Sequence, residues 1–153
     1  MDSAALTHLE AIRQLKARYL RFVDTKAWSD LRALFTEDAT LHFTQRDFGP
    51  EPADEAIERI SRMLVPGVIS VHRTTNPEIT LIDDRRATGI WPMTDLLRFP
   101  ADSDNSFGLL WLNGHGYYHE DYVRSDEGWR IAAMRLDRTL VESEQTPGRE
   151  QRT

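Results

Sequence analysis

One carboxylate of this chain, Asp95, lies at a position of a predicted strand where the pattern predicts an apolar side chain. From Arg85 to Phe99 the sequence alternates as a half-buried strand does, so every second residue should face the interior. The odd-numbered positions of this stretch are Ala87, Gly89, Trp91, Met93, Asp95, Leu97 and Phe99. A buried carboxylate without a partner is costly, so Asp95 must be neutral, hydrogen-bonded or turned toward a polar cavity. The alternative is a bulge near Pro92 that turns Asp95 to solvent.

A second candidate is His72, in the strand that comes before. Its even-numbered face carries His72, Thr74 and Asn76, whereas Val71, Ile79 and Leu81 occupy the other face. An imidazole exchanges a proton near neutral pH and can serve as a general base. A structural or surface histidine is the alternative, since a polar stripe usually faces solvent.

Two further candidates lie near the end of the first predicted helix. Asp24 closes this helix, where the negative end of the helix dipole disfavours an acid, and a solvated helix end is the alternative. Tyr19 lies about one turn earlier, on the apolar stripe, where a buried hydroxyl needs a partner. Core packing is the default role of such a tyrosine. Arg135, in the last strand, is either an exposed residue or a guanidinium close to Asp95 or a substrate carboxylate.

Composition narrows the kind of ligand. The chain has 153 residues, enough for one domain, and contains no cysteine, which removes disulfides, thiol nucleophiles and thiolate metal sites. Its net charge of −6 argues against nucleic acid. No stretch is long and apolar enough to span a membrane, and the N-terminus lacks the pattern of a secretory signal. We therefore expect a cytoplasmic protein that binds a small organic molecule.

The sequence contains no motif that indicates a metal site or a nucleotide site. His115 and His119 would lie roughly 13 Å apart along one strand, too far to chelate one ion. Glycine-rich phosphate loops and the serine-hydrolase motif are missing from the sequence. We expect no metal and no cofactor.

The elements that must position these residues are helices first and strands afterwards. Apolar residues three and four apart predict a long helix over Ala4 to Val23, and shorter helices are expected from Ser29 or Asp30 to Phe35, with Ser29 as the cap, and from Asp54 to Leu64. A short strand is predicted over Ala39 to Thr44, and turn signals divide the chain from Ile69 onward into four long strands. Glu142 to Thr153 reads as a disordered tail. This order predicts an α+β fold with the helices packed on one face of a curved, mainly antiparallel sheet.

Four stretches of sequence, two near the start of the chain and two near its end, resemble a known family. Tyr19 to Asp24 and Asp30 to Ala39 are similar to the opening of the SnoaL-like branch of the NTF2-like superfamily, and Gly116 to Arg124 with Gly128 to Ile131 are similar to its last two strands. The resemblance covers about Ala4 to Val141. It implies the NTF2-like cone, in which three N-terminal helices pack into the curved sheet, and a single domain over 4–141.

The resemblance also implies a pocket. Bile-acid 7α-dehydratases, scytalone dehydratases and hexachlorocyclohexane dehydrochlorinases of this branch share an Asp–His pair. The pattern of the bile-acid enzymes can be laid on Tyr19, Asp24, His72, Asp95 and Arg135, in the same order and at the same intervals. The dehydrochlorinases have lysine at the position of Tyr19, which favours loss of water over loss of chloride. Trp91, Met93, Phe99 and Trp111 are expected to form apolar walls for a cyclic or polyketide-like substrate, although they are equally suited to an ordinary core.

The expected function is a cofactor-independent dehydratase, a lyase that removes water from a β-hydroxy carbonyl compound through the Asp24–His72 dyad, with Tyr19 and Asp95 as further catalytic residues. An isomerase or polyketide cyclase that uses Asp95 as its base is the first alternative. A non-catalytic ligand-binding protein, or one like the small β subunits of ring-hydroxylating oxygenases, is the second. The family also implies a homo-oligomer, with a trimer favoured over a dimer.

Overall fold

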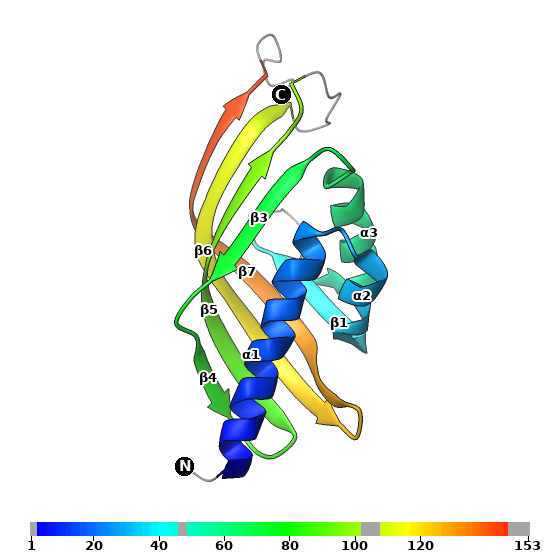
Figure 1. Cartoon of the computed structure of the whole chain (residues 1–153), viewed down its shortest axis with the longest axis vertical. Coiled ribbons are helices and arrows are strands. Elements are labelled where there is room, and N and C mark those ends of the chain that lie inside the picture. Colours follow the sequence, from blue (N-terminus) through cyan, green and yellow to red (C-terminus); the bar gives the residue numbers. More distant parts are fainter. Residues whose placement is uncertain (1–2, 46–48, 102–107, 147–153) are drawn as a thin grey trace.

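The computed structural model describes residues 3–45, 49–101 and 108–146. Three helices, α1 (Ser3–Asp24), α2 (Trp28–Ala33) and α3 (Ala53–Met63), pack on one side of a single sheet (Figure 1). The strands are β1 (Phe35–Phe43), β2 (Glu51–Pro52), β3 (Ile69–Thr74), β4 (Glu78–Leu81), β5 (Arg86–Arg98), β6 (Leu109–Ser125) and β7 (Gly128–Gln145). This arrangement confirms the predicted α+β class.

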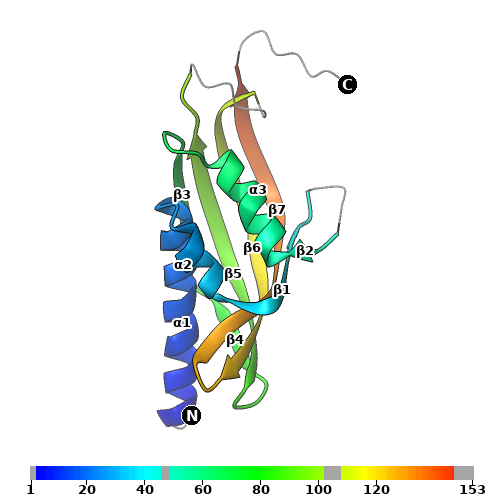
Figure 2. The same cartoon turned by 90° about the vertical axis from the view of Figure 1, so that its right-hand side faces the viewer.

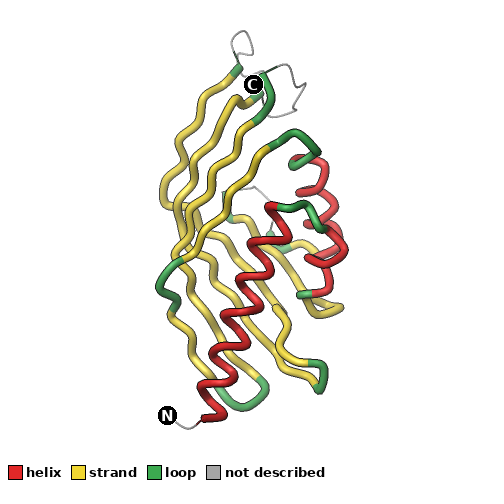
Figure 3. The backbone as a smooth tube through the Cα atoms, viewed as in Figure 1, coloured by secondary structure: helices red, strands yellow, loops and turns green. Residues whose placement is uncertain are grey.

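The sheet is mixed and open. Its strand order is β2-β1-β7-β6-β5-β3, with β4 also paired to β5, and every pairing is antiparallel except that of β1 with β7. The long strands β5, β6 and β7 bow around the helices, which occupy the concave side (Figures 2 and 3). Side chains on the concave face therefore meet those of α1 and α3.

Helix α1 follows the predicted stripe closely. Ile12, Leu15, Tyr19 and Val23 are all buried, and the helix extends one residue beyond each predicted end. The stripe holds one unexpected member, Lys16, which is fully buried. The predicted first helix is confirmed.

The ends of two other elements differ from the prediction. Helix α2 begins at Trp28 behind Ala27, no side chain caps it, and Ser29 lies inside the helix, so the expected cap is wrong. Strand β1 begins at Phe35 instead of Ala39, because Phe35 pairs with Ile131 of β7, and the second helix ends at Ala33 instead of Phe35. Long-range pairing here decides a boundary that local propensity left open.

The region after Ile69 forms five strands where four were predicted. Asn76 has a φ of 40° and separates β3 from β4, and the adjacent Pro77 has no N–H to donate to a ladder. At the other end, Glu142 to Gln145 continue β7 because residues 109–113 of β6 pair with them, so the expected tail is wrong for these four residues. The remainder of that tail, from Pro147 onward, lies outside the described residues.

Across residues 3–45, 49–101 and 108–146, no helix combines the length and the apolar character needed to cross a bilayer.

Candidate active site

A cavity of about 410 Å³ lies between the concave face of the sheet and helices α1 and α3. Most of its walls are apolar, and its polar side chains come from both the helices and the strands. The apolar lining is Val23, Phe43, Ile60, Met63, Leu64, Leu97, Phe99, Leu109, Leu112, Leu136 and Val141. The polar lining is Tyr19, Gln45, Arg59, His72, Asp95, Tyr118 and Arg138. Such a shape suits a small, largely apolar molecule with a few polar atoms.

Asp24 and His72 meet where the end of α1 approaches β3. The Nδ1 atom of His72 lies 2.7 Å from Oδ1 of Asp24, and the backbone N–H of His72 donates to Oδ2 over 2.9 Å. The hydroxyl of Ser70, two residues earlier on β3, donates to Oδ1 over 3.0 Å. When Nδ1 carries the proton and donates it to Asp24, Nε2 is left as an acceptor on the cavity side.

These contacts affect the acidity of Asp24. Partial burial raises the pKa of this carboxyl, but the hydrogen bonds from His72 and Ser70 and the charge on His72 outweigh it, so the pKa lies below its ordinary value. A lowered carboxyl pKa in the folded state stabilises the fold above the unfolded pKa of about 3.9, and this stability is lost as the pH falls through the folded value.

We expect the carboxyl carbon of Asp24 to titrate below the ordinary range in a ¹³C NMR experiment. Because the His72 ring and Ser70 each supply a contact to the charged form, His72→Ala and Ser70→Ala should each move the titration toward higher pH, with the larger shift in His72→Ala. A wild-type value at or above the ordinary one would contradict the geometry of the pair.

Asp95 faces the interior, as the strand pattern predicts. The residue is 5% exposed, and β5 pairs with β6 from Arg86 to Arg98 without a register shift, so Pro92 introduces no bulge. Asp95 is also the direct cross-strand partner of His72. As a result, Nε2 of His72 lies 3.7 Å from Oδ2 of Asp95, an ion-pair distance that is too long for a hydrogen bond.

The arginine that reaches Asp95 is Arg138, which the sequence analysis missed. Its Nη1 donates to Oδ1 of Asp95 over 2.8 Å and its Nη2 donates to Oδ2, a two-pronged ion pair. Burial lowers the pKa of Arg138, but the bonds to Asp95 outweigh it and raise the pKa above its ordinary value. Gly114 faces Asp95 across the β5–β6 pairing, and a Cβ at this position would lie 1.7 Å from Nη1 of Arg138. A side chain at position 114 would therefore have to displace the ion pair from this position.

Arg135 lies on the other face of β7, outside the cavity. Its side chain is 50% exposed and bonds to Asp137 over 3.0 Å. Met134 and Leu136 are buried on the inner face, so strand alternation places Arg135 outside and Arg138 inside. The expectation that Arg135 contacts Asp95 or the substrate is therefore corrected to Arg138, and the parity of the strand was the signal that could have found it.

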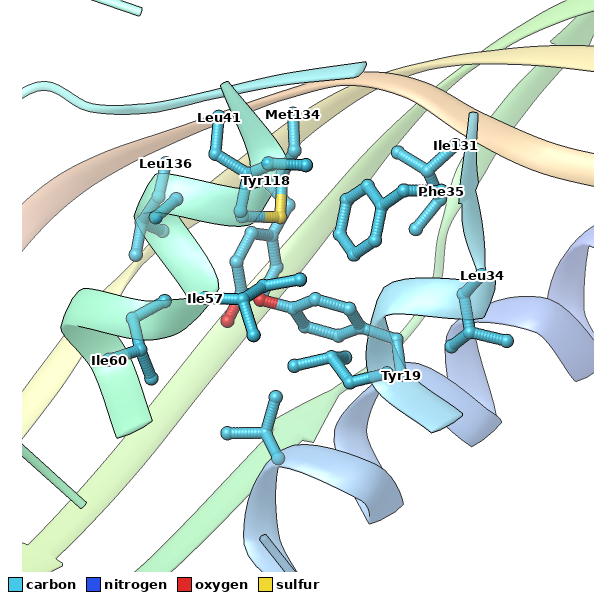
Figure 4. Close-up of a cluster of buried hydrophobic side chains, with 14 of the residues drawn as sticks. Tyr19, Leu34, Phe35, Leu41, Ile57, Ile60, Tyr118, Ile131, Met134 and Leu136 are labelled. Atoms are coloured by element: carbon cyan, nitrogen blue, oxygen red, sulfur yellow. The ribbon is translucent and has the colours of Figure 1, made fainter. Parts of the chain in front are cut away.

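Tyr19 shares its end of the cavity with Tyr118 of β6, a second residue that the sequence analysis missed. Their rings meet edge to face, with centroids 5.8 Å apart, and their hydroxyl groups point toward one another (Figure 4). Burial raises the pKa of both phenols, so both stay protonated near neutral pH. Protonated hydroxyls can donate hydrogen bonds to a carbonyl oxygen in the cavity.

Of the four predicted wall residues, only Phe99 lines the cavity. Trp91 is buried elsewhere in the core and donates from Nε1 to the hydroxyl of Tyr122 over 2.8 Å. Met93 is also buried but borders a shallow depression instead, and Nε1 of Trp111 bonds to Glu144. Five of the eleven apolar residues that line the cavity are leucines, and the sequence analysis predicted none of these five as a wall residue. Within the described residues, no group of three His, Asp or Glu side chains is placed to hold a metal ion.

A known protein family matches most of the chain. The SnoaL-like domain matches residues 4–135 of the chain. The chain belongs to the SnoaL-like family. This confirms the resemblance seen in the sequence, and the cone of helices and curved sheet is the one expected for a SnoaL-like protein of the NTF2-like superfamily.

Solved structures share this SnoaL-like fold at low sequence identity. The protein Kfla4162 from Kribbella flavida is 24% identical, with 90% of this chain and 95% of that chain covered and a TM-score of 0.79. A type 2 hexachlorocyclohexane dehydrochlorinase (LinA) is 16% identical, with 99% of each chain covered and a TM-score of 0.77. A candidate scytalone dehydratase from Novosphingobium aromaticivorans is 19% identical, with 99% of this chain and 100% of that chain covered and a TM-score of 0.77.

Proposed function

We propose that this SnoaL-like protein is a cofactor-independent lyase that removes water from a small, largely apolar β-hydroxy carbonyl compound. The main support is the position of His72, whose Nδ1 contacts Asp24 while its ring also lines the cavity. An imidazole held in this way is suited to take a proton from a carbon atom.

In this proposal His72 is the general base. Its Nε2 takes the proton from the carbon next to the substrate carbonyl, a carbon–carbon double bond forms, and the carbon–oxygen bond to the β-hydroxyl breaks. The same proton then passes from His72 to the departing oxygen, which leaves as water, so no external reagent is consumed. Nδ1 of His72 lies 2.7 Å from Oδ1 of Asp24, and its Nε2 lies 3.7 Å from Oδ2 of Asp95. Both carboxylates therefore stabilise the positive charge on His72.

Tyr19 and Tyr118 would bind the carbonyl oxygen. Negative charge grows on this oxygen as the proton leaves, and two protonated hydroxyls in an apolar cavity are suited to stabilise it. Arg138 would act mainly on Asp95, because its two guanidinium nitrogens donate to the two oxygens of that carboxylate.

The known relatives support the elimination class. Two of the similar structures are named for eliminations, a hexachlorocyclohexane dehydrochlorinase and a candidate scytalone dehydratase. The cavity volume of about 410 Å³ falls in the range of small-molecule sites, and its leucine-rich walls favour a cyclic or polyketide-like substrate. A homo-oligomer, with a trimer ahead of a dimer, and a cytoplasmic location stay predictions.

A panel of cyclic β-hydroxy ketones incubated with the protein in D₂O tests the proposal. We expect the ultraviolet band of the conjugated ketone to appear for at least one compound, at a rate proportional to protein concentration. Deuterium incorporation without loss of water would favour the isomerase or cyclase alternative, in which Asp95 is the base. Binding without elimination or exchange across the panel would favour a ligand-binding protein.

A further inference from the structure

A buried ion pair lies directly behind the two tyrosines and takes no part in the mechanism above. Lys16 of α1 is 1% exposed and Glu120 of β6 is 2% exposed, and Nζ of Lys16 lies 2.5 Å from Oε1 of Glu120. Two charges removed from water in this way carry a large desolvation cost, which their attraction repays only in part. Stability alone is therefore a weak account of the pair.

The carboxylate of Glu120 is held from its far side. Its Oε2 accepts a hydrogen bond from the hydroxyl of Tyr122, and that hydroxyl in turn accepts one from Nε1 of Trp91 over 2.8 Å. Both carboxylate oxygens of Glu120 thus have partners. The series of hydrogen bonds that runs from Trp91 through Tyr122 and Glu120 to Lys16 lies in the core. Neither Lys16 nor Glu120 lines the cavity.

The Nζ atom of Lys16 faces the rings of the two cavity tyrosines. Burial lowers the pKa of Lys16, and the adjacent Glu120 carboxylate opposes this and favours the charged ammonium. Its Nζ lies 3.5 Å from the ring centroid of Tyr118 and 4.2 Å from that of Tyr19. Contacts of this length are cation–π interactions, and they strengthen when the cation is desolvated. The hydroxyl ends of the same rings line the cavity beside Asp95 and Arg138.

The two charges of the pair act on the phenols with opposite sign. Burial raises the pKa of Tyr19, and the Glu120 carboxylate raises it further, so both favour the protonated hydroxyl. The Lys16 ammonium, seated on the ring faces, stabilises negative charge that is shared with the phenol oxygen. A phenol next to such a cation is a stronger hydrogen-bond donor to an anion than the same phenol without it.

We propose that Lys16, held by Glu120, is a positioning residue that orients the Tyr19 and Tyr118 rings and strengthens their hydroxyls as donors to an oxyanion in the cavity. The inference rests on the proposed function for the location of the oxyanion, but it does not require that His72 act as a base.

Binding of two small probes tests the role of Lys16 without knowledge of the substrate. The probes are 4-nitrophenolate, an oxyanion at pH 8, and 4-nitrotoluene, its uncharged counterpart of similar shape. Isothermal titration calorimetry gives the ratio of their affinities. We expect Glu120→Gln, which removes the carboxylate that favours the charged form of the buried Lys16, to lower this ratio. The double variant Lys16→Met/Glu120→Gln, which removes the cation, should lower the ratio about tenfold, through weaker binding of the anion.

Two further variants separate this effect from a loss of packing. Arg62→Met/Glu58→Gln removes an exposed ion pair of α3 and should not change the ratio. In a Tyr19→Phe/Tyr118→Phe background the donors are gone, so adding Lys16→Met/Glu120→Gln should lower the ratio no further. If Lys16→Met/Glu120→Gln does not fold, Lys16→Gln/Glu120→Gln, which keeps a hydrogen bond without charge, replaces it.

Three results would overturn the inference. They are an unchanged ratio in the double variant, an equal loss of affinity for both probes, and a ratio that does not respond to Tyr19→Phe/Tyr118→Phe. Failure of the proposed elimination is a separate outcome, because it is read from product formation and from His72 variants, whereas the probe ratio depends on the tyrosines and Lys16.

Discussion

Replacing His72 with Gln is expected to lower turnover of the elimination by about 10² to 10⁴-fold, because a proton transfer by a positioned side chain typically contributes that much. The glutamine side chain keeps polar atoms close to Asp24 but cannot accept and return a proton near neutral pH. The measurement is kcat/KM from the ultraviolet band of the product. Affinity for 4-nitrotoluene provides the control, since it should change little if the cavity keeps its shape.

Asp24→Asn should cause a loss of similar size by a different route. The amide keeps the size of the carboxylate but removes the negative charge that stabilises a protonated His72 at 2.7 Å. Ser70→Ala is the matched variant, because it removes one hydrogen bond to Asp24 and leaves the contact with His72 in place. We expect Ser70→Ala to keep most of the turnover. Full activity in either Asp24→Asn or His72→Gln would contradict the proposed role of His72 as base and of Asp24 as its partner.

The parts of the site that obey a local rule could be predicted from the sequence. Asp95 faces inward because a regular strand alternates its faces, and the pairing of β5 with β6 keeps that alternation past Pro92. The stripe on α1 likewise predicted that Tyr19 is buried. These predictions needed only the periodicity of one element.

The choice between two arginines shows where interval matching fails. Intervals along the chain from Asp95 pointed to Arg135, but such an interval includes the connecting segments, whose lengths vary among relatives. The side of a strand on which a residue lies depends instead on parity. Because Met134 and Leu136 face the core, Arg138 shares their face and Arg135 does not.

Other parts of the site could not be predicted from any local pattern. Lys16 and Glu120 are 104 positions apart, and a lysine on a helical stripe usually extends its charged end to water. The close approach of Gly114 to the ion pair depends on two neighbours, Asp95 from β5 and Arg138 from β7. Both features arise only once the registers of β5, β6 and β7 are set, so they belong to the tertiary structure.

Arg138→Met should destabilise the fold by about 3 to 5 kcal/mol, because it leaves the Asp95 carboxylate buried without its two donors. The Asp95 side chain is only 1% exposed, so water cannot replace the guanidinium without a change in the packing. Urea unfolding followed by circular dichroism measures the loss. Arg135→Met is the matched control, three positions away, and its exposed pair with Asp137 should contribute about 1 kcal/mol at most.

The double variant Asp95→Leu/Arg138→Met separates stability from chemistry. Removing both charges together avoids an unpaired buried ion, so most of the lost stability should return. Turnover of the double variant should nevertheless be lower than that of the wild type, because the positive charge on His72 then lacks the carboxylate that lies 3.7 Å from its Nε2. If Arg138→Met alone unfolds at the same urea concentration as Arg135→Met, Asp95 does not depend on Arg138 for its burial. If the double variant has the turnover of the wild type as well as the restored stability, the ion pair serves only the fold, and His72 works with Asp24 alone.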